Sequence, residues 1–451
     1  MIEHIIETLK HKFRTNCSGA AAVVFALVLP ALFAAVGLAV DLGQAHNLKT
    51  RLNNALDKTA LAAGTLAGGE SYIQETAGKF FHANYPDDRL GEIVDLQINV
   101  GDEIVTVAAT AQVKNRFMSL LGKPYTEVSA EAEATKAFWN SIELALVLDI
   151  TGSMAGQRIV DLRNAASALV DIVIRDSDQH HEDIYSKIAL VPYSMGVNPG
   201  SYAEDVRGPV ASGTCTSPGC QRFRFRNPFN QWVTFDVSNC VSERSGAFAY
   251  TDDPPSTAYV GWNYPAGNNP CPPNPVIPLT DNKDLLKSQI NSFQAVGSTA
   301  GHIGTAWGWY MLSPHWGYLW PEESRPAPYD TERLFKIAVL MTDGEYNSPY
   351  CNGVISQDAT AGSGSMANKI NCNAPNGSSF EQAEHLCDAM KNDGILVYSI
   401  GFHIDNLAEA KAIMEHCASG PDYYYLAEDG EQLDAAFRDI ARKISSLYLS
   451  R

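Results

Sequence analysis

The sequence is poor in basic residues and lacks the short motifs of several enzyme classes. Lys and Arg number 33 against 51 Asp and Glu, and no long run of basic residues occurs, so we expect no nucleic-acid partner. The motifs H-E-x-x-H, G-x-S-x-G and C-x-x-C are absent from the sequence, which argues against zinc proteases, α/β-type serine hydrolases and common zinc sites. We therefore expect a protein that is not an enzyme.

The length and composition indicate a folded protein with more than one domain. A chain of 451 residues exceeds the usual size of a single core, so two or three domains are expected. Apolar residues make up 45% and charged residues 19% of the chain, which is typical of globular domains and not of disordered segments.

The nine cysteines are distributed unevenly. Cys17 is alone near the N-terminus, and the other eight lie in the second half of the sequence: Cys215, Cys220, Cys240, Cys271, Cys351, Cys372, Cys387 and Cys417. An even number beyond a hydrophobic segment favours disulfides in an oxidising compartment over zinc sites or free thiols. Eight cysteines allow 105 pairings, so the full connectivity stays open. The positions suggest two pairs, Cys351 with Cys372 and Cys387 with Cys417.

Residues 19–40 form an uncharged apolar segment that predicts a membrane anchor. A helix of this length is about 33 Å long, which is enough for a hydrocarbon core of about 30 Å. A cleaved signal peptide is the alternative, but its apolar region is shorter. Basic residues flank the segment on both sides, so the charges do not decide its orientation. The cysteines favour a single-pass protein with a cytoplasmic N-terminus (1–18) and the bulk of the chain outside.

Residues 41–138 are expected to form a small α+β stalk. Apolar residues recur at helical spacing from 47 to 68, which predicts an amphipathic helix that continues out of the membrane helix. A second helix and three strands are expected at 72–84, 92–100, 103–113 and 125–137. A long N-terminal helix before a small sheet is also the plan of pilin-like proteins.

Residues 139–451 are expected to form an α/β domain with a doubly wound, mainly parallel sheet. Helical patterns separate short apolar runs, which read as buried parallel strands at 142–148, 187–192, 334–341 and 395–400. Between about 198 and 280, and again between 345 and 379, this pattern is interrupted, and we interpret both stretches as insertions.

Polar side chains at the ends of two of these strands predict a cation site. Asp149 and Asp343 follow buried strands, and ligands bind beyond the carboxyl ends of strands in such sheets. With the hydroxyls of Thr151 and Ser153 they form an all-oxygen set, which suits a hard divalent cation, Mg²⁺ before Mn²⁺ or Ca²⁺.

The D-x-T-x-S sequence at 149–153 resembles the metal-ion-dependent adhesion site (MIDAS) of von Willebrand factor A domains. That family adds a Thr and an Asp from two further loops, and the matching residues are Thr299 in GSTAG and Asp343 in MTDG. The resemblance implies that Asp149, Thr151, Ser153, Thr299 and Asp343 surround the ion. A coordination position left to water would accept a carboxylate from a protein partner.

The N-terminal stretch from 19 to about 65 resembles the TadE/TadG-like module of tight-adherence (Flp) pilus systems. The later segments DITGSM, YSIGF, HCAS and YYYLA also match habits of TadG-like proteins. The resemblance implies an anchor in a bacterial inner membrane, a periplasmic body and a part in pilus assembly or anchoring. Gly19 lacks the Glu at the fifth following position that pilin processing requires, which favours permanent anchoring. A metal-dependent envelope adhesin unrelated to a pilus is the alternative.

Overall fold

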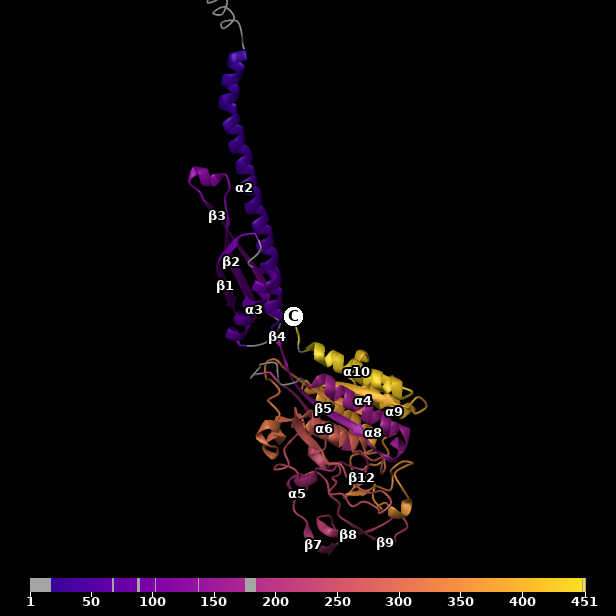
Figure 1. Cartoon of the computed structure of the whole chain (residues 1–451). Coiled ribbons are helices and arrows are strands. Elements are labelled where there is room, and N and C mark those ends of the chain that lie inside the picture. The colour runs from indigo at the N-terminus through magenta and orange to yellow at the C-terminus, as the bar shows by residue number, and fades with distance from the viewer. Residues whose placement is uncertain are drawn as a thin grey trace, which may run out of the picture. The chain divides into compact units, whose positions relative to one another are not determined.

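The computed structural model describes residues 18–66, 69–86, 90–101, 103–136, 138–174, 184–447 and 449–450 (Figure 1). The chain divides into two compact units, Met1–Ala137 and Phe138–Ser450, and each has its own core. Of the N-terminus 1–18 that is expected in the cytoplasm, residues 1–17 lie outside the described residues.

The first unit is organised around one continuous helix, α2 (Ser18–Thr65). Its early apolar side chains, such as Leu27 and Phe33, are exposed, whereas Leu48 and Leu52 are fully buried. The segment Val23–Thr65 contains an apolar stretch long enough to cross a membrane. The helix therefore has an apolar part that is largely exposed, followed by a part that packs in the core of the unit.

A three-stranded antiparallel sheet and a second helix complete this unit. The strands are β1 (Glu92–Val100), β2 (Ile104–Lys114) and β3 (Tyr125–Thr135), in the order β1-β2-β3. Alternate residues of β2 are buried against α2, which is the pattern of a sheet with one covered face. Helix α3 (Glu70–Asn84) packs on both α2 and β1. The elements expected for the stalk are all present, with ends shifted by at most three residues.

The second unit contains a six-stranded sheet in which five strands are parallel. Its order along the sheet is β10 (Ile277–Thr280), β6 (Ser186–Tyr193), β5 (Ser141–Asp149), β11 (Leu334–Thr342), β14 (Leu396–Phe402) and β15 (Tyr424–Ala427). Strand β10 runs antiparallel to β6 at one edge, and the remaining neighbours are parallel. The sequence predicted the four central strands but neither edge strand, because both edge strands are four residues long and incompletely buried.

Helices cover both faces of this sheet. Side chains of β5 alternate between two cores: Ala145 and Val147 face one, and Leu144 and Leu146 face the other. The first core includes helices α7 (Gly301–Tyr310), α8 (Ser379–Asn392) and α9 (Ala408–Cys417). The second includes α4 (Gln157–Val173), α6 (Lys283–Asn291) and α10 (Gly430–Leu447). A two-residue pairing of β4 (Phe138–Trp139) with β16 (Leu449–Ser450) joins the two ends of the unit.

The two insertions have secondary structure of their own. The first contains α5 (Ala203–Arg207) and a three-stranded sheet of β7 (Ala211–Cys215), β8 (Cys220–Arg226) and β9 (Trp232–Asp236). It ends in the edge strand β10, so the last residues of the stretch 198–280 belong to the main sheet. The second contains a short hairpin of β12 (Tyr350–Cys351) and β13 (Val354–Ile355). Both insertions contribute to one small apolar core that includes Phe223, Phe225 and Val354.

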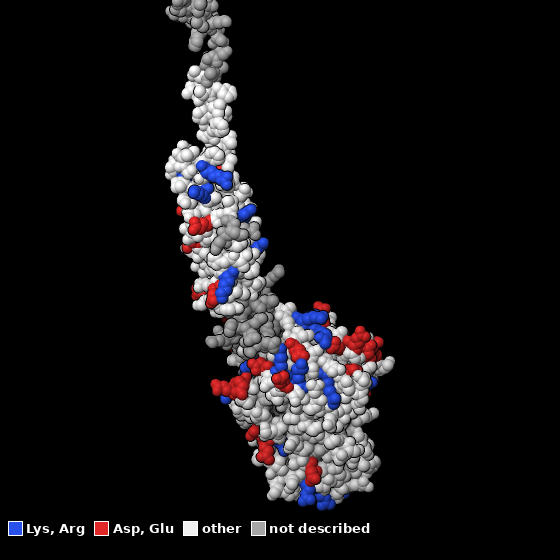
Figure 2. Space-filling view, in the orientation of Figure 1, with Lys and Arg blue, Asp and Glu red and all other residues white. Residues whose placement is uncertain are grey.

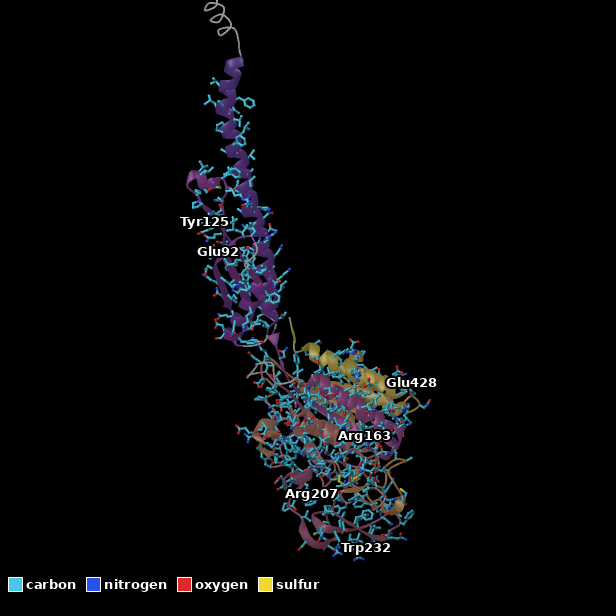
Figure 3. All side chains as sticks on the ribbon, viewed as in Figure 1. Glu92, Tyr125, Arg163, Arg207, Trp232 and Glu428 are labelled. Carbon is cyan, nitrogen blue, oxygen red and sulfur yellow. A yellow bond between two sulfur atoms is a disulfide. The ribbon has the colours of Figure 1, made fainter. Side chains whose placement is uncertain are left out.

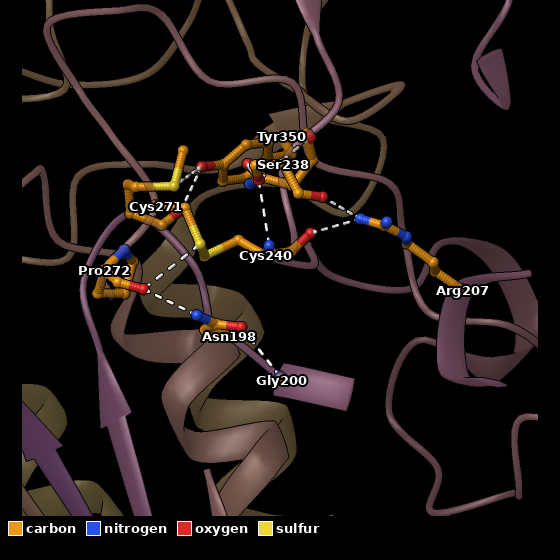
Figure 4. Close-up of a disulfide and its surroundings, with 10 residues drawn as sticks. Asn198, Gly200, Arg207, Ser238, Cys240, Cys271, Pro272 and Tyr350 are labelled. Carbon is orange, nitrogen blue, oxygen red and sulfur yellow. Dashed lines mark hydrogen bonds between the residues drawn. A yellow bond between two sulfur atoms is a disulfide. The ribbon is translucent and has the colours of Figure 1, made fainter. Parts of the chain in front are cut away.

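Four disulfides involve all eight cysteines of the second half of the chain. They join Cys215 to Cys220, Cys240 to Cys271, Cys351 to Cys372 and Cys387 to Cys417, and the last two are the pairs suggested by the sequence. Around Cys240–Cys271, the side chain of Asn198 donates to the Pro272 carbonyl, and Arg207 donates to the carbonyls of Ser238 and Cys240 (Figure 4). The first insertion is therefore held by a covalent bond and by polar contacts.

Candidate metal centre

Two carboxylates lie at the point where the order of the parallel strands reverses. From β5 the chain continues to β6 on one side, and β11 occupies the other side of β5. Asp149 is the last residue of β5, and Asp343 follows the last residue of β11. Because β5 and β11 are adjacent and parallel, both carboxylates emerge at the same edge of the sheet, where ligands bind in open α/β folds.

Hydroxyl groups from the loop after β5 connect the two carboxylates. The Ser153 hydroxyl donates to Asp343 Oδ1 at 2.5 Å, and it lies 2.8 Å from the Thr151 hydroxyl. The Thr151 backbone N–H donates to Asp149 Oδ1 at 2.9 Å, which fixes the start of the loop. Four of the five residues predicted from the sequence are thus joined by a chain of hydrogen bonds.

The fifth residue, Thr299, approaches the same place from a second loop. The Gly152 N–H donates to the Gly297 carbonyl at 2.8 Å, which joins the two loops. A Cβ atom placed on Gly344 would lie 3.7 Å from Ser153 Oγ and 3.9 Å from Thr299 Oγ1. The hydroxyls of Thr299 and Ser153 therefore border the space beside Gly344, and a side chain at Gly344 would occupy that space.

Residues of both insertions brace the loop that carries Thr299. The Asn347 side chain accepts a hydrogen bond from the Thr299 N–H at 3.0 Å. Asn269 accepts from the Ser298 N–H and donates to the Ser298 hydroxyl, both at 2.9 Å. These contacts satisfy buried polar groups and hold the loop in one conformation.

The buried carboxylates carry more negative charge than their surroundings neutralise. Burial, followed by the charge of Asp343, raises the pKa of Asp149 from 3.8 to about 7. Burial also raises the pKa of Asp343, despite the hydrogen bond from Ser153. Asp149 Oδ2 accepts from the hydroxyls of Thr342 at 2.7 Å and Tyr193 at 3.2 Å, which are neutral donors. A divalent cation would favour the ionised form of both carboxylates.

A basic side chain at the start of α4 partly compensates this charge. Arg158 Nη1 lies 2.8 Å from Asp343 Oδ2, and the Arg158 side chain is 37% exposed whereas that of Asp343 is fully buried. The hydrogen-bond donors to Asp149 are uncharged groups, namely the Thr151 N–H and the hydroxyls of Tyr193 and Thr342. Arg158 would therefore compete with a cation for Asp343.

The donor set fits a hard cation. Within the described ranges no group of three or more His, Cys, Asp or Glu residues is placed to hold a metal. A cation at this edge would instead combine two carboxylates with hydroxyls and water, an all-oxygen set that suits a hard divalent cation. Thr151 is buried, whereas Gly152 and Ser153 are exposed, so the site is open to solvent on the Ser153 side.

Sequence reasoning missed five residues around this site: Arg158, Tyr193, Thr342, Asn269 and Asn347. Two of them adjoin predicted elements, since Thr342 precedes Asp343 and Tyr193 ends the strand β6 next to β5. Their positions could have drawn attention to them. The two asparagines lie in the insertions, where no periodic pattern indicates which residue returns to the sheet.

Comparison with known proteins identifies the N-terminal segment. Residues 19–66 match the sequence model of the Tad family, described as Flp pilus-assembly TadE/G-like. This match covers about a tenth of the chain and includes most of α2. No curated protein matches the chain.

Several solved structures resemble the chain at low identity. They include the vWF domain of the type V pili tip protein Mfa5 from Porphyromonas gingivalis (13% identity, 70% of this chain and 98% of that chain, TM-score 0.38). The adhesive tip pilin GBS104 from Group B Streptococcus agalactiae also resembles it (12%, 65% and 98%, TM-score 0.35). A third is proximal thread matrix protein 1 from the mussel byssus with a zinc-occupied MIDAS motif (12%, 68% and 46%, TM-score 0.30). Because these TM-scores are below 0.5, the inference of a cation site rests on the geometry above.

Proposed function

We propose that Asp149, Thr151, Ser153, Thr299 and Asp343 hold a divalent cation, most simply Mg²⁺, at the edge of a von Willebrand A-type sheet. The observation that carries this proposal is the pair of buried, insufficiently neutralised carboxylates with hydroxyls beside Gly344. Directly or through water, these five side chains would hold the ion. The ion would supply a positive charge that an anionic group of a partner can reach from the exposed Ser153 side.

The protein would act as a non-enzymatic, single-pass component of a bacterial envelope. The TadE/G-like match at residues 19–66 and the long apolar helix favour a TadG-like part in assembling or anchoring an Flp-type pilus. The four disulfides favour a periplasmic location for the second unit, with the anchor in the inner membrane and the N-terminus in the cytoplasm.

A carboxylate from the protein partner would complete the coordination of the ion. Such a carboxylate replaces a water ligand, so the affinity for the partner becomes dependent on the cation. Asp149 and Asp343 keep the ion in place, while Thr151, Ser153 and Thr299 orient it towards the solvent-exposed side.

The test measures cation binding and partner binding on the full chain in detergent. Isothermal titration with Mg²⁺ and Mn²⁺ should give saturable binding that Asp149→Ala abolishes, whereas the exposed control Asp171→Ala should leave it unchanged. Capture of pilus proteins on the immobilised chain should require the cation and should disappear with chelator. Equal cation binding by the wild type and Asp149→Ala would overturn the metal proposal.

The alternative, an adhesin for external ligands, is separated by the identity of the captured partner. The TadE/G-like match favours the pilus-assembly reading. Cation-dependent binding to matrix proteins, together with no binding to pilin or to the pilus secretion machinery, would favour the adhesin instead.

A further inference from the structure

The loop between β2 and β3 exposes two adjacent leucines. It contains a short 3-10 helix, Met118–Leu121, in which Leu120 is 84% and Leu121 is 77% exposed. Phe117 at its start is also 42% exposed. Single exposed apolar residues are ordinary, but contiguous ones at a loop tip indicate a surface that contacts a membrane or another protein.

This loop is fixed against α2 within the same unit. A Cβ atom on Gly37 would lie 2.6 Å from the ring of Phe117, so the ring rests directly on the backbone of the helix. The Asp41 carboxylate accepts hydrogen bonds from the N–H groups of Arg116, Phe117 and Met118, at 2.9, 2.9 and 2.6 Å. Asp41 is 1% exposed, so the loop seals the first acidic side chain that follows the apolar segment. The loop is therefore fixed at one position along α2, beside Gly37 and Asp41.

This position of the loop coincides with the end of the helical segment that would lie in a bilayer. A hydrocarbon core of about 30 Å takes about 20 helical residues at 1.5 Å each. Starting at Gly19, the core ends close to Leu38, between Gly37 and Asp41. The run of exposed apolar side chains that includes Val23 and Leu27 extends to Leu42, and Leu48 is already buried in protein. Leu120 and Leu121 thus lie beside the boundary of the core.

Charge around the loop matches a membrane surface. Residues 114–125 contain three basic residues, Lys114, Arg116 and Lys123, and no acidic one, in a chain of net charge −18. All three are exposed, and Figure 2 shows Lys and Arg side chains gathering where the uncharged part of α2 ends. Tyr125, labelled in Figure 3, is 51% exposed and begins β3. Lys, Arg and Tyr beside exposed leucines are typical of segments that lie at the boundary of a bilayer.

We propose that this loop is a second membrane contact, with Leu120 and Leu121 inserted into the lipid leaflet next to the end of the α2 span. Lys114, Arg116 and Lys123 face the lipid phosphates. The inference rests on the membrane anchor of the proposed function and is independent of the cation site. The contact fixes the rotation of α2 about its axis and holds the β-sheet of the first unit close to the bilayer.

The test places an environment-sensitive probe at single positions of the full chain in lipid vesicles. In a Cys17→Ser background, each of Leu120→Cys, Leu27→Cys and Leu61→Cys is labelled with NBD. Leu27 is 73% exposed in the apolar part of α2 and reports the anchor itself. Leu61 is 66% exposed on the same helix, about 30 Å beyond Asp41, and is the aqueous control.

We expect the probe at position 120 to show blue-shifted emission and to resist aqueous iodide, like the probe at position 27. The probe at position 61 should be quenched. If position 120 is quenched as strongly as position 61 while position 27 is protected, the loop contact is refuted and the anchor stands. If position 27 is also quenched, the anchor fails and the loop contact fails with it.

Discussion

Arg158→Ala removes the guanidinium that lies 2.8 Å from Asp343 Oδ2 and should strengthen cation binding. At an effective dielectric constant near 20, two unit charges at this distance attract by about 6 kcal/mol. The Arg158 side chain is 37% exposed, so solvent screening and its own hydration reduce the net value of the pair to about 1 kcal/mol. A cation that no longer competes with this pair should bind about fivefold more tightly.

Isothermal titration of Mg²⁺ into the full chain in detergent measures this effect. Lys287→Ala is the matched control, because Lys287 forms a comparable ion pair with Asp171 at 2.7 Å on the surface of the same unit. The control should leave the Mg²⁺ affinity unchanged. Weaker binding by Arg158→Ala would mean that Arg158 positions Asp343 for the ion, and the reasoning from competition would be wrong.

Three further predictions concern the same unit. The pKa of Asp149 is raised from its usual value of 3.8 to about 7 in the folded state, so the folded chain binds a proton more tightly than the unfolded chain. The cation-free protein should therefore lose stability as the pH rises from about 4 to about 7. Denaturation at several pH values should show this slope, and Asp149→Asn should flatten it. Gly344→Ala should weaken Mg²⁺ binding in titrations while the cation-free unfolding temperature stays near that of the wild type, because its methyl group fills space beside Ser153. Replacing Cys240 and Cys271 by serine opens a loop of 31 residues and should lower the free energy of unfolding by about 3.5 kcal/mol in chemical denaturation.

The sequence predicts the elements whose burial is complete. Between their ends, β5 and β11 are apolar runs interrupted by Glu143 and Lys336, which pair with each other. Helices cover both faces of these strands, and such runs are visible without a structure. The ends of adjacent parallel strands meet at one edge, so Asp149 and Asp343 could be expected to lie together. The approach of Thr299 could be inferred from the family resemblance but not from spacing, because Thr299 lies 146 positions after Ser153.

The parts that escaped prediction are short, exposed or irregular. Strands β10 and β15 are edge strands of four residues, too short to show a pattern. Arg158 occupies the first turn of an amphipathic helix, where a basic residue usually faces solvent. Asn269 reaches Ser298 from within the first insertion, which contains two disulfides and shares a small core with the second insertion.

Because α2 is unbroken from Ser18 to Thr65, one continuous helix connects the apolar segment to the part of the first unit that packs against the sheet. Pro30 is the single proline along it, so the weakest point of its backbone ladder lies within the apolar segment and not at the base of the sheet. In the proposed membrane-anchored state, a sideways force on the sheet would therefore act as a torque on the part of α2 inside the bilayer. Beyond Pro30 the helix contains no further proline, so no second proline kink lies between the apolar segment and the sheet.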